Sequence, residues 1–218
     1  CPVATSTPPL EGLETFPPNL TLRMSFGSGC VVQDGATQAT VSGSAVLTVS
    51  NLVFTETNVS GSLVASFDNL KVNGVLVANG SAQATLNLTI NVDAETYAGT
   101  VAVTLTNLML PNGLGFTGSA NINLNSAGTT VVTTNLTSAK GVVIKLNATV
   151  VAQPSGSVLV NTSGTNTVGD YTVQANNLVI DADVCEQGPI GGSLSFTKGG
   201  QTGTLTFSNS CTYTYTGP

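Results

Sequence analysis

The residues able to do metal or acid–base chemistry are few in this sequence, which contains no histidine. One acidic cluster stands out, formed by Asp181, Asp183 and Glu186. Asp181 and Asp183 are two residues apart, so on a strand they share one face, and carboxylate oxygens are ligands that Ca²⁺ accepts. Ca²⁺ takes six or more oxygens and its loop signature is missing here, so we interpret the cluster as a solvated strand end. Calcium binding is the alternative.

The sequence cannot form the common catalytic triads for nucleophilic catalysis. Ser-His-Asp and Cys-His arrangements both need histidine, so both are excluded. Residues 113–118, "GLGFTG", match the dinucleotide-binding pattern in letters. They follow a Pro-Asn-Gly turn and no helix is expected after them, so the match is attributed to chance. We expect a protein that is not an enzyme and that uses no cofactor.

The four cysteines are Cys1, Cys30, Cys185 and Cys211. They form no CxxC pair, which together with the missing histidine excludes a Cys/His zinc site. We expect Cys1 to pair with Cys30 and Cys185 with Cys211, since each bond would then close a local loop. A second interpretation is that Cys1 carries a lipid anchor, as in processed bacterial lipoproteins, which would leave an odd number of thiols. Both interpretations place the chain outside the cytoplasm, in the extracellular space or at the cell surface.

Composition limits the partners of this 218-residue chain. Only 7% of its residues are charged, against about 25% in typical proteins. The net charge is −6 and the five basic residues are scattered, whereas nucleic-acid binding needs clustered Lys and Arg. No window approaches the roughly 18 apolar residues of a transmembrane helix. We therefore expect no nucleic-acid partner and no transmembrane segment.

The apolar residues follow a period of two, which is typical of strands with one buried face. The clearest run is residues 81–93, "SAQATLNLTINVD", in which six apolar residues alternate with polar ones. Asn73-Gly74 between two apolar runs is the favoured two-residue hairpin turn. The sequence therefore predicts an all-β fold, an antiparallel up-and-down meander of about 10–12 long strands that closes into a barrel or a sandwich.

An internal repeat supports this interpretation and also opens another. Gly followed by Ser or Thr and an apolar residue recurs at Gly43, Gly61, Gly80, Gly99 and Gly118, at spacings of about 19 residues. A regular period is also typical of a β-solenoid, which is the alternative fold. The hairpin turns between repeats, and the loss of the period towards the C-terminus, favour the meander.

A second recurring feature is an Asn-Leu step at which the alternation slips by one residue. The asparagines are Asn51, Asn69, Asn107 and Asn177. A one-residue slip would turn a strand inside out, whereas a β-bulge inserts one residue and restores the facing. Asn tolerates the backbone angles that a bulge requires. We predict four structural bulges rather than a ladder of sugar-binding amides, because aromatic stacking residues are scarce.

Residues 1–18 contain two Pro-Pro pairs and no alternation, so we expect a Pro-rich extended tail or arm before a single all-β domain over residues 19–218. Two functions follow. The first is a non-enzymatic extracellular or cell-surface structural protein, a fibre or layer subunit that contacts copies of itself through strand edges or the arm. The second is an exported β-barrel module that binds an apolar ligand or a carbohydrate.

Overall fold

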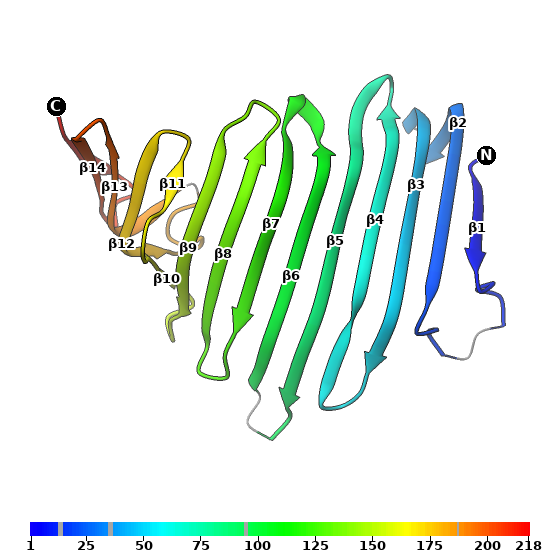
Figure 1. Cartoon of the computed structure of the whole chain (residues 1–218), viewed down its shortest axis with the longest axis horizontal. Coiled ribbons are helices and arrows are strands. Elements are labelled where there is room, and N and C mark those ends of the chain that lie inside the picture. The colour runs from blue at the N-terminus through cyan, green and yellow to red at the C-terminus, as the bar shows by residue number, and fades with distance from the viewer. Residues whose placement is uncertain (13–14, 35–36, 94–95, 187) are drawn as a thin grey trace.

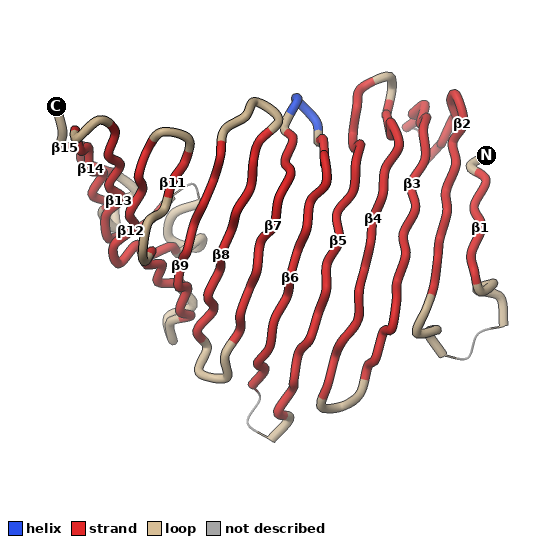
Figure 2. The backbone as a smooth tube through the Cα atoms, viewed as in Figure 1, coloured by secondary structure: helices blue, strands red, loops and turns tan. Residues whose placement is uncertain are grey.

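In a computed structural model the chain is almost entirely β, with strands over 72% of its residues and helix over 1%. The structure describes residues 1–12, 15–34, 37–93, 96–186 and 188–218. Figure 1 shows long strands side by side from the N-terminus onward, and Figure 2 shows one short helical turn among them.

The first half of the chain forms the longest strands. They are β1 (Val3–Thr7), β2 (Leu20–Asp34), β3 (Thr37–Phe54), β4 (Asn58–Val72), β5 (Val75–Asn91) and β6 (Thr96–Met109). A 3₁₀ turn, η1 (Pro111–Gly113), precedes β7 (Gly115–Leu124), β8 (Thr129–Ser138) and β9 (Val143–Ala152). The remaining strands are shorter on average: β10 (Val158–Thr162), β11 (Thr167–Val168), β12 (Tyr171–Ile180), β13 (Pro189–Lys198), β14 (Gln201–Phe207) and β15 (Tyr213–Thr216).

The strands pair in chain order, and every pairing is antiparallel. The path runs from β1 to β10 and continues through β12 to β15, while β11 pairs with both β9 and β12. Strands β9, β10, β12 and β11 therefore close a small barrel, because β10 also lies between β9 and β12. The antiparallel meander predicted from the sequence is confirmed, and closure is limited to this small barrel, with outer strands on either side.

Figure 1 looks down the shortest axis of the molecule, and β4 to β8 lie side by side in that view with no other described element over them, whereas the end of β2 crosses near the top of β3. This part of the sheet is therefore a single layer. Most domains bury a sheet face against a second layer, which is how they obtain a core. Here the buried apolar residues among those described are few: Leu20, Cys30, Val49, Ala78, Ala175 and Cys185. The core is accordingly thin.

Long strands in this sheet are bent at the Asn-Leu steps. Asn51, Asn69, Asn107 and Asn177 have positive φ angles of 53°, 46°, 46° and 48°. The pairing register shifts around each of them, for example between Ser50 and Val53 on β3. A residue in the left-handed region beside a register shift is the geometry of a β-bulge. The bulges add twist to strands of up to 18 residues, well beyond the usual length of about 5–6.

Each bulge is held from both sides by the neighbouring strands. On one side a side-chain oxygen accepts a hydrogen bond from the backbone N–H of the bulged asparagine. The donor and acceptor pairs are Asn51 with Asn19 at 2.9 Å, Asn69 with Asn79 at 3.0 Å, Asn107 with Thr117 at 3.1 Å, and Asn177 with Asn161 at 2.7 Å. The acceptor satisfies an N–H that the bulge removes from the strand ladder.

On the other side of the bulge, the adjacent strand carries a glycine, whose missing side chain lets the bulged backbone approach closely. A Cβ at Gly80 would meet the carbonyl oxygen of Asn107, and a Cβ at Gly192 would meet that of Asn177. The 19-residue glycine repeat thus marks places where two backbones approach each other within a meander.

Residues 1–18 are not free of the sheet. β1, which lies within them, pairs with β2 in the register Val3–Ser25 to Thr7–Thr21. Among the described residues the structure has 15 strands, and ten of them (β2 to β9, β12 and β13) are ten or more residues long, in agreement with the 10–12 long strands predicted; the additional strands, such as β1, β11 and β15, are short.

Replacing Gly80 by Ala tests whether the bulge at Asn107 needs a glycine on the adjacent strand. We expect Gly80→Ala to lower the free energy of unfolding by about 2–5 kcal/mol, since it adds a steric clash to the cost of a positive φ. Gly128→Ala is the control, because Gly128 also has a positive φ (75°) but has no atom within 4 Å of a built Cβ. It should lose only about 1–2 kcal/mol. Urea unfolding followed by circular dichroism gives both values, and equal losses would contradict the close-approach role of Gly80.

Candidate interaction surface

In the acidic cluster identified in the sequence, Asp181 accepts hydrogen bonds from the chain's own backbone. Asp181 Oδ1 accepts hydrogen bonds from the backbone N–H groups of Asp183 at 3.1 Å and Val184 at 3.3 Å, directly after β12. This is an Asx-type turn, in which the carboxylate stands in for a backbone acceptor. Among the described residues, no group of three or more His, Cys, Asp or Glu side chains is arranged to hold a metal ion.

Sequence reasoning missed one pair of residues with catalytic potential. Ser195 and Lys198 have the Ser-x-x-Lys spacing of some hydrolases. They lie on β13, however, where residues three apart point to opposite faces of the sheet. Ser195 Oγ lies 3.0 Å from Thr204 Oγ1, and Lys198 Nζ forms an exposed ion pair with Asp170 at 3.1 Å. The pair is not arranged as a nucleophile and its base.

Each end of the sheet contains one disulfide. Cys1 is bonded to Cys30 at the N-terminal end, and Cys185 is bonded to Cys211 at the C-terminal end. This is the local pairing expected from the sequence, and it uses the Cys1 sulfur that a thioether-linked lipid would need. Disulfides form and persist in oxidising compartments, which points to an exported chain. Among the described residues, no helix is long and apolar enough to cross a membrane.

The feature that does stand out is one face of the sheet. Residues paired across neighbouring strands share a face, so rows can be followed from strand to strand. One row, from β2 to β9, consists of Leu22, Leu47, Ala65, Ala82, Leu105, Gly118, Leu136 and Ile144. The next row on this face consists of Leu20, Val49, Leu63, Ala84, Val103, Ala120, Thr134 and Leu146. We call this side the apolar face.

The opposite side is polar. The row between the two apolar ones consists of Thr21, Thr48, Val64, Gln83, Thr104, Ser119, Asn135 and Lys145. We call this side the polar face. A sheet with this alternation normally packs its apolar side on a core and leaves the other side wet.

Most of the apolar face is not covered within the described chain, although Leu20 and Val49 of its second row, at the N-terminal end, are buried. Every residue of its first row is only half-buried, and Leu63 of the second row is exposed. The chain exposes 13205 Å², whereas a compact monomer of 21.9 kDa exposes about 9,300 Å². The excess is about 3,900 Å² on that scaling. Large uncovered apolar surfaces on soluble proteins mark interaction sites.

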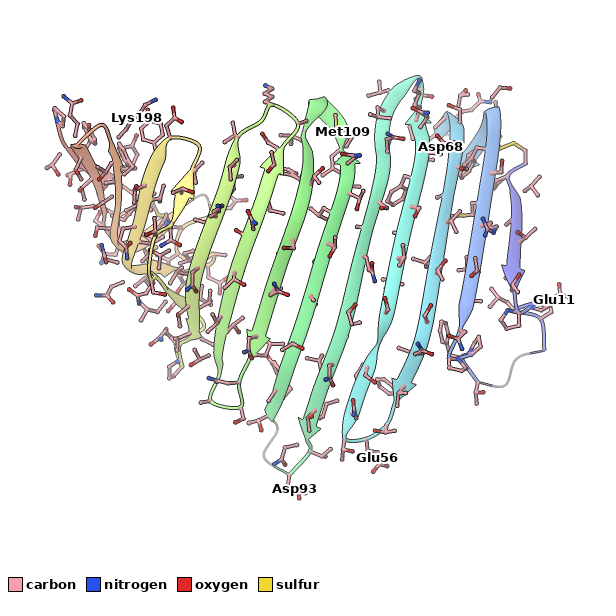
Figure 3. All side chains as sticks on the ribbon, in the orientation of Figure 1. Glu11, Glu56, Asp68, Asp93, Met109 and Lys198 are labelled. Carbon is pink, nitrogen blue, oxygen red and sulfur yellow. A yellow bond between two sulfur atoms is a disulfide. The ribbon has the colours of Figure 1, made fainter. Side chains whose placement is uncertain are left out.

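Charged side chains lie away from the middle of this face. Strands β5, β6, β7 and β8 contain no Asp, Glu, Lys or Arg. Figure 3 shows Glu56 and Asp93 at the turns on one edge of the sheet and Asp68 near the opposite end of β4. The centre of the apolar face is therefore uncharged and carries no electrostatic barrier to association.

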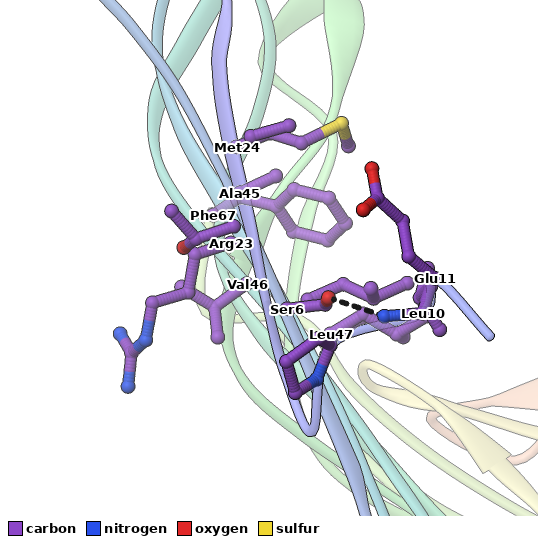
Figure 4. A pocket seen from close by; sticks show the side chains of 14 residues that line it. Ser6, Leu10, Glu11, Arg23, Met24, Ala45, Val46, Leu47 and Phe67 are labelled. Atoms are coloured by element: carbon purple, nitrogen blue, oxygen red, sulfur yellow. Dashed lines mark hydrogen bonds between the residues drawn. The ribbon is translucent and has the colours of Figure 1, made fainter. Parts of the chain in front are cut away.

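At its N-terminal end the apolar face is partly covered by residues 8–12, which follow β1. These residues are only part of the tail or arm predicted over residues 1–18, and from here on the word arm refers to residues 8–12. The arm folds back, and the backbone N–H of Leu10 donates a hydrogen bond to Ser6 Oγ at 3.2 Å. Figure 4 shows Leu10 and Glu11 facing Met24, Ala45, Leu47 and Phe67 across a groove, with the Arg23 guanidinium pointing away. The groove has a volume of about 760 Å³, within the range of small-molecule sites.

The sheet also has two ends. β1 and β15 terminate the strand path, so each has one side without a strand partner within the described chain. The pairing of β1 with β2 extends from Thr21 to Ser25 of β2. Unpaired edges can accept a strand from another molecule.

No protein-family model, curated protein or solved structure matches this chain. The apolar face, the groove and the edges are therefore the features that bear on function.

The Cys1–Cys30 bond should hold the arm in place over the apolar face. We expect the double variant Cys1→Ser/Cys30→Ser to exchange the backbone amides of residues 3–12 at least about tenfold faster, because local opening then costs less. Hydrogen exchange with mass spectrometry measures this. The matched control, Cys185→Ser/Cys211→Ser, removes a bond of similar loop length and should leave residues 3–12 unchanged. An equal effect of both variants would contradict a local role for the Cys1–Cys30 bond.

Proposed function

We propose that this protein is a non-enzymatic structural protein of the cell surface or extracellular space that assembles with copies of itself. The observation that carries the proposal is the single-layer sheet with an uncovered apolar face. A chain in this state leaves unburied much of the surface that would otherwise offset the entropy of folding. Association supplies the missing contact area, and an exported location agrees with the two disulfides.

Two further features support assembly. β1 and β15 lie at opposite ends of the sheet in Figure 2, so edge pairing between copies would extend the sheet in one direction. A head-to-tail contact of this kind generates a fibre where successive rotations do not close into a ring. The low charge of the strands leaves few side chains that would discourage this pairing.

Self-association is tested by light scattering coupled to size exclusion, over at least a hundredfold dilution in non-reducing buffer. We expect molar masses that are multiples of 21.9 kDa and that fall on dilution. Electron microscopy of the most concentrated sample checks for fibres or layers. A constant mass of one chain at every concentration, without assemblies on the grid, would overturn the proposal.

The second candidate is an exported binding module for an apolar ligand, and the groove under the arm favours it. The groove floor consists of aliphatic, thioether and aromatic side chains, including Leu22, Met24 and Phe67. Native mass spectrometry of the purified chain would show a co-purified apolar molecule if this were the function. Leu47→Asp would abolish that adduct, whereas Thr48→Asp on the opposite face would retain it.

A further inference from the structure

We infer that two copies of this chain pack with their apolar faces together and form a two-layer β-sandwich. The inference rests on the proposed self-assembly and specifies its contact surface. The contact is isologous, meaning that the same patch is used by both copies across a two-fold axis. The patch is the part of the apolar face on β4 to β8, between the arm at one end and the small barrel at the other.

The size of this patch matches a stable interface. Five strands at about 4.8 Å spacing and ten residues at about 3.3 Å give a patch of about 24 by 33 Å. Each copy would then bury about 800 Å², or about 1,600 Å² in total, which is the standard size of a specific protein interface. The groove under the arm is much too small to account for this surface, since it reaches only β1 to β4 and the arm.

The relief of the patch is self-complementary. In the two central rows β6 carries Val103 and Leu105, which form a ridge. The flanking strands carry small residues in the same rows, namely Ala82 and Ala84 on β5, and Gly118 and Ala120 on β7. A two-fold axis between β6 and β7 therefore places the ridge of each copy against the small residues Gly118 and Ala120 of the other. Side chains of two inner faces interdigitate in this way in β-sandwiches, whose layers lie about 10 Å apart.

Charge favours a second copy over an anionic lipid surface. Membrane surfaces attract clusters of basic residues, whereas this chain has a net charge of −6 and five scattered cations. β5 to β8 contain no charged residue, and the two on β4, Asp68 and Lys71, lie towards the end of that strand, so two copies can approach without burying a charge at the centre of the patch. In the sandwich both polar faces point outward, where Thr, Ser and Asn remain hydrated.

The test compares charges placed on the two faces of β6. Val103→Lys places an ammonium in the centre of the patch, and Thr104→Lys places it on the polar face one residue away. We expect Val103→Lys to raise the dissociation constant of the dimer at least about 100-fold, because the ammonium would be buried without a partner. Thr104→Lys should change it less than threefold. Sedimentation velocity measures both constants, and circular dichroism verifies that each variant folds.

A second measurement avoids buried charge altogether. Ala120→Cys lies in the patch and Ser119→Cys lies on the polar face of the same strand. We expect a thiol reagent to label Ala120→Cys at least about tenfold more slowly than Ser119→Cys in the associated state. The difference should disappear on dilution to the monomer.

The outcomes separate this inference from the proposed function. If the chain associates but both cysteines label equally and Val103→Lys still associates, the face-to-face contact is wrong, while self-assembly through the edges stands. If the chain is monomeric at all concentrations, both fail. If the chain is monomeric and floats with phosphatidylcholine vesicles, the apolar face binds lipid rather than a copy, which also overturns the inference.

Discussion

The organisation of this protein depends on one constraint, namely that strands β4 to β8 form a single layer. A sheet in one layer satisfies its backbone hydrogen bonds by strand pairing but cannot bury its apolar side within the same chain. The scarcity of buried residues follows directly from this. Cohesion within the chain therefore comes from continuous antiparallel pairing, from two disulfides and from the small barrel at one end.

Long strands require twist, and the bulges provide it. An asparagine in the left-handed region lengthens the strand by one residue, and the strand on either side adapts to it. One neighbour contributes an oxygen, such as Thr117 Oγ1, and the other contributes a glycine, such as Gly80. The same three-strand unit recurs at the four bulges, and the glycines of the internal repeat lie where neighbouring backbones approach closely.

The two faces of the sheet have different roles because of how polar groups are distributed. Thr, Ser and Asn keep the polar face hydrated without net charge, whereas the apolar face offers a continuous surface whose centre lacks charge. A surface of this kind gains free energy when it is removed from water. This links the composition of the chain, with its low charge and abundant Thr and Asn, to the self-association that we propose.

Much of this architecture was accessible from the sequence, since strand alternation, hairpin turns and bulge positions are encoded by near neighbours. Residues 81–93 predict β5 by period alone, and Asn107 predicts a bulge because the apolar phase slips beside it. The acceptors of the bulges, such as Asn19 for Asn51, were not predicted, because they lie 10 to 32 residues away and their pairing depends on register.

The local pattern thus determined that this chain forms long antiparallel strands with one apolar and one polar face. Only the tertiary structure decided that most of the sheet remains open in one layer, that closure involves β9 to β12 alone, and that the N-terminal segment adds a strand and an arm. The physical reason is that a period of two defines which side of a strand is apolar, whereas what covers that side is set by twist and register summed over many strands.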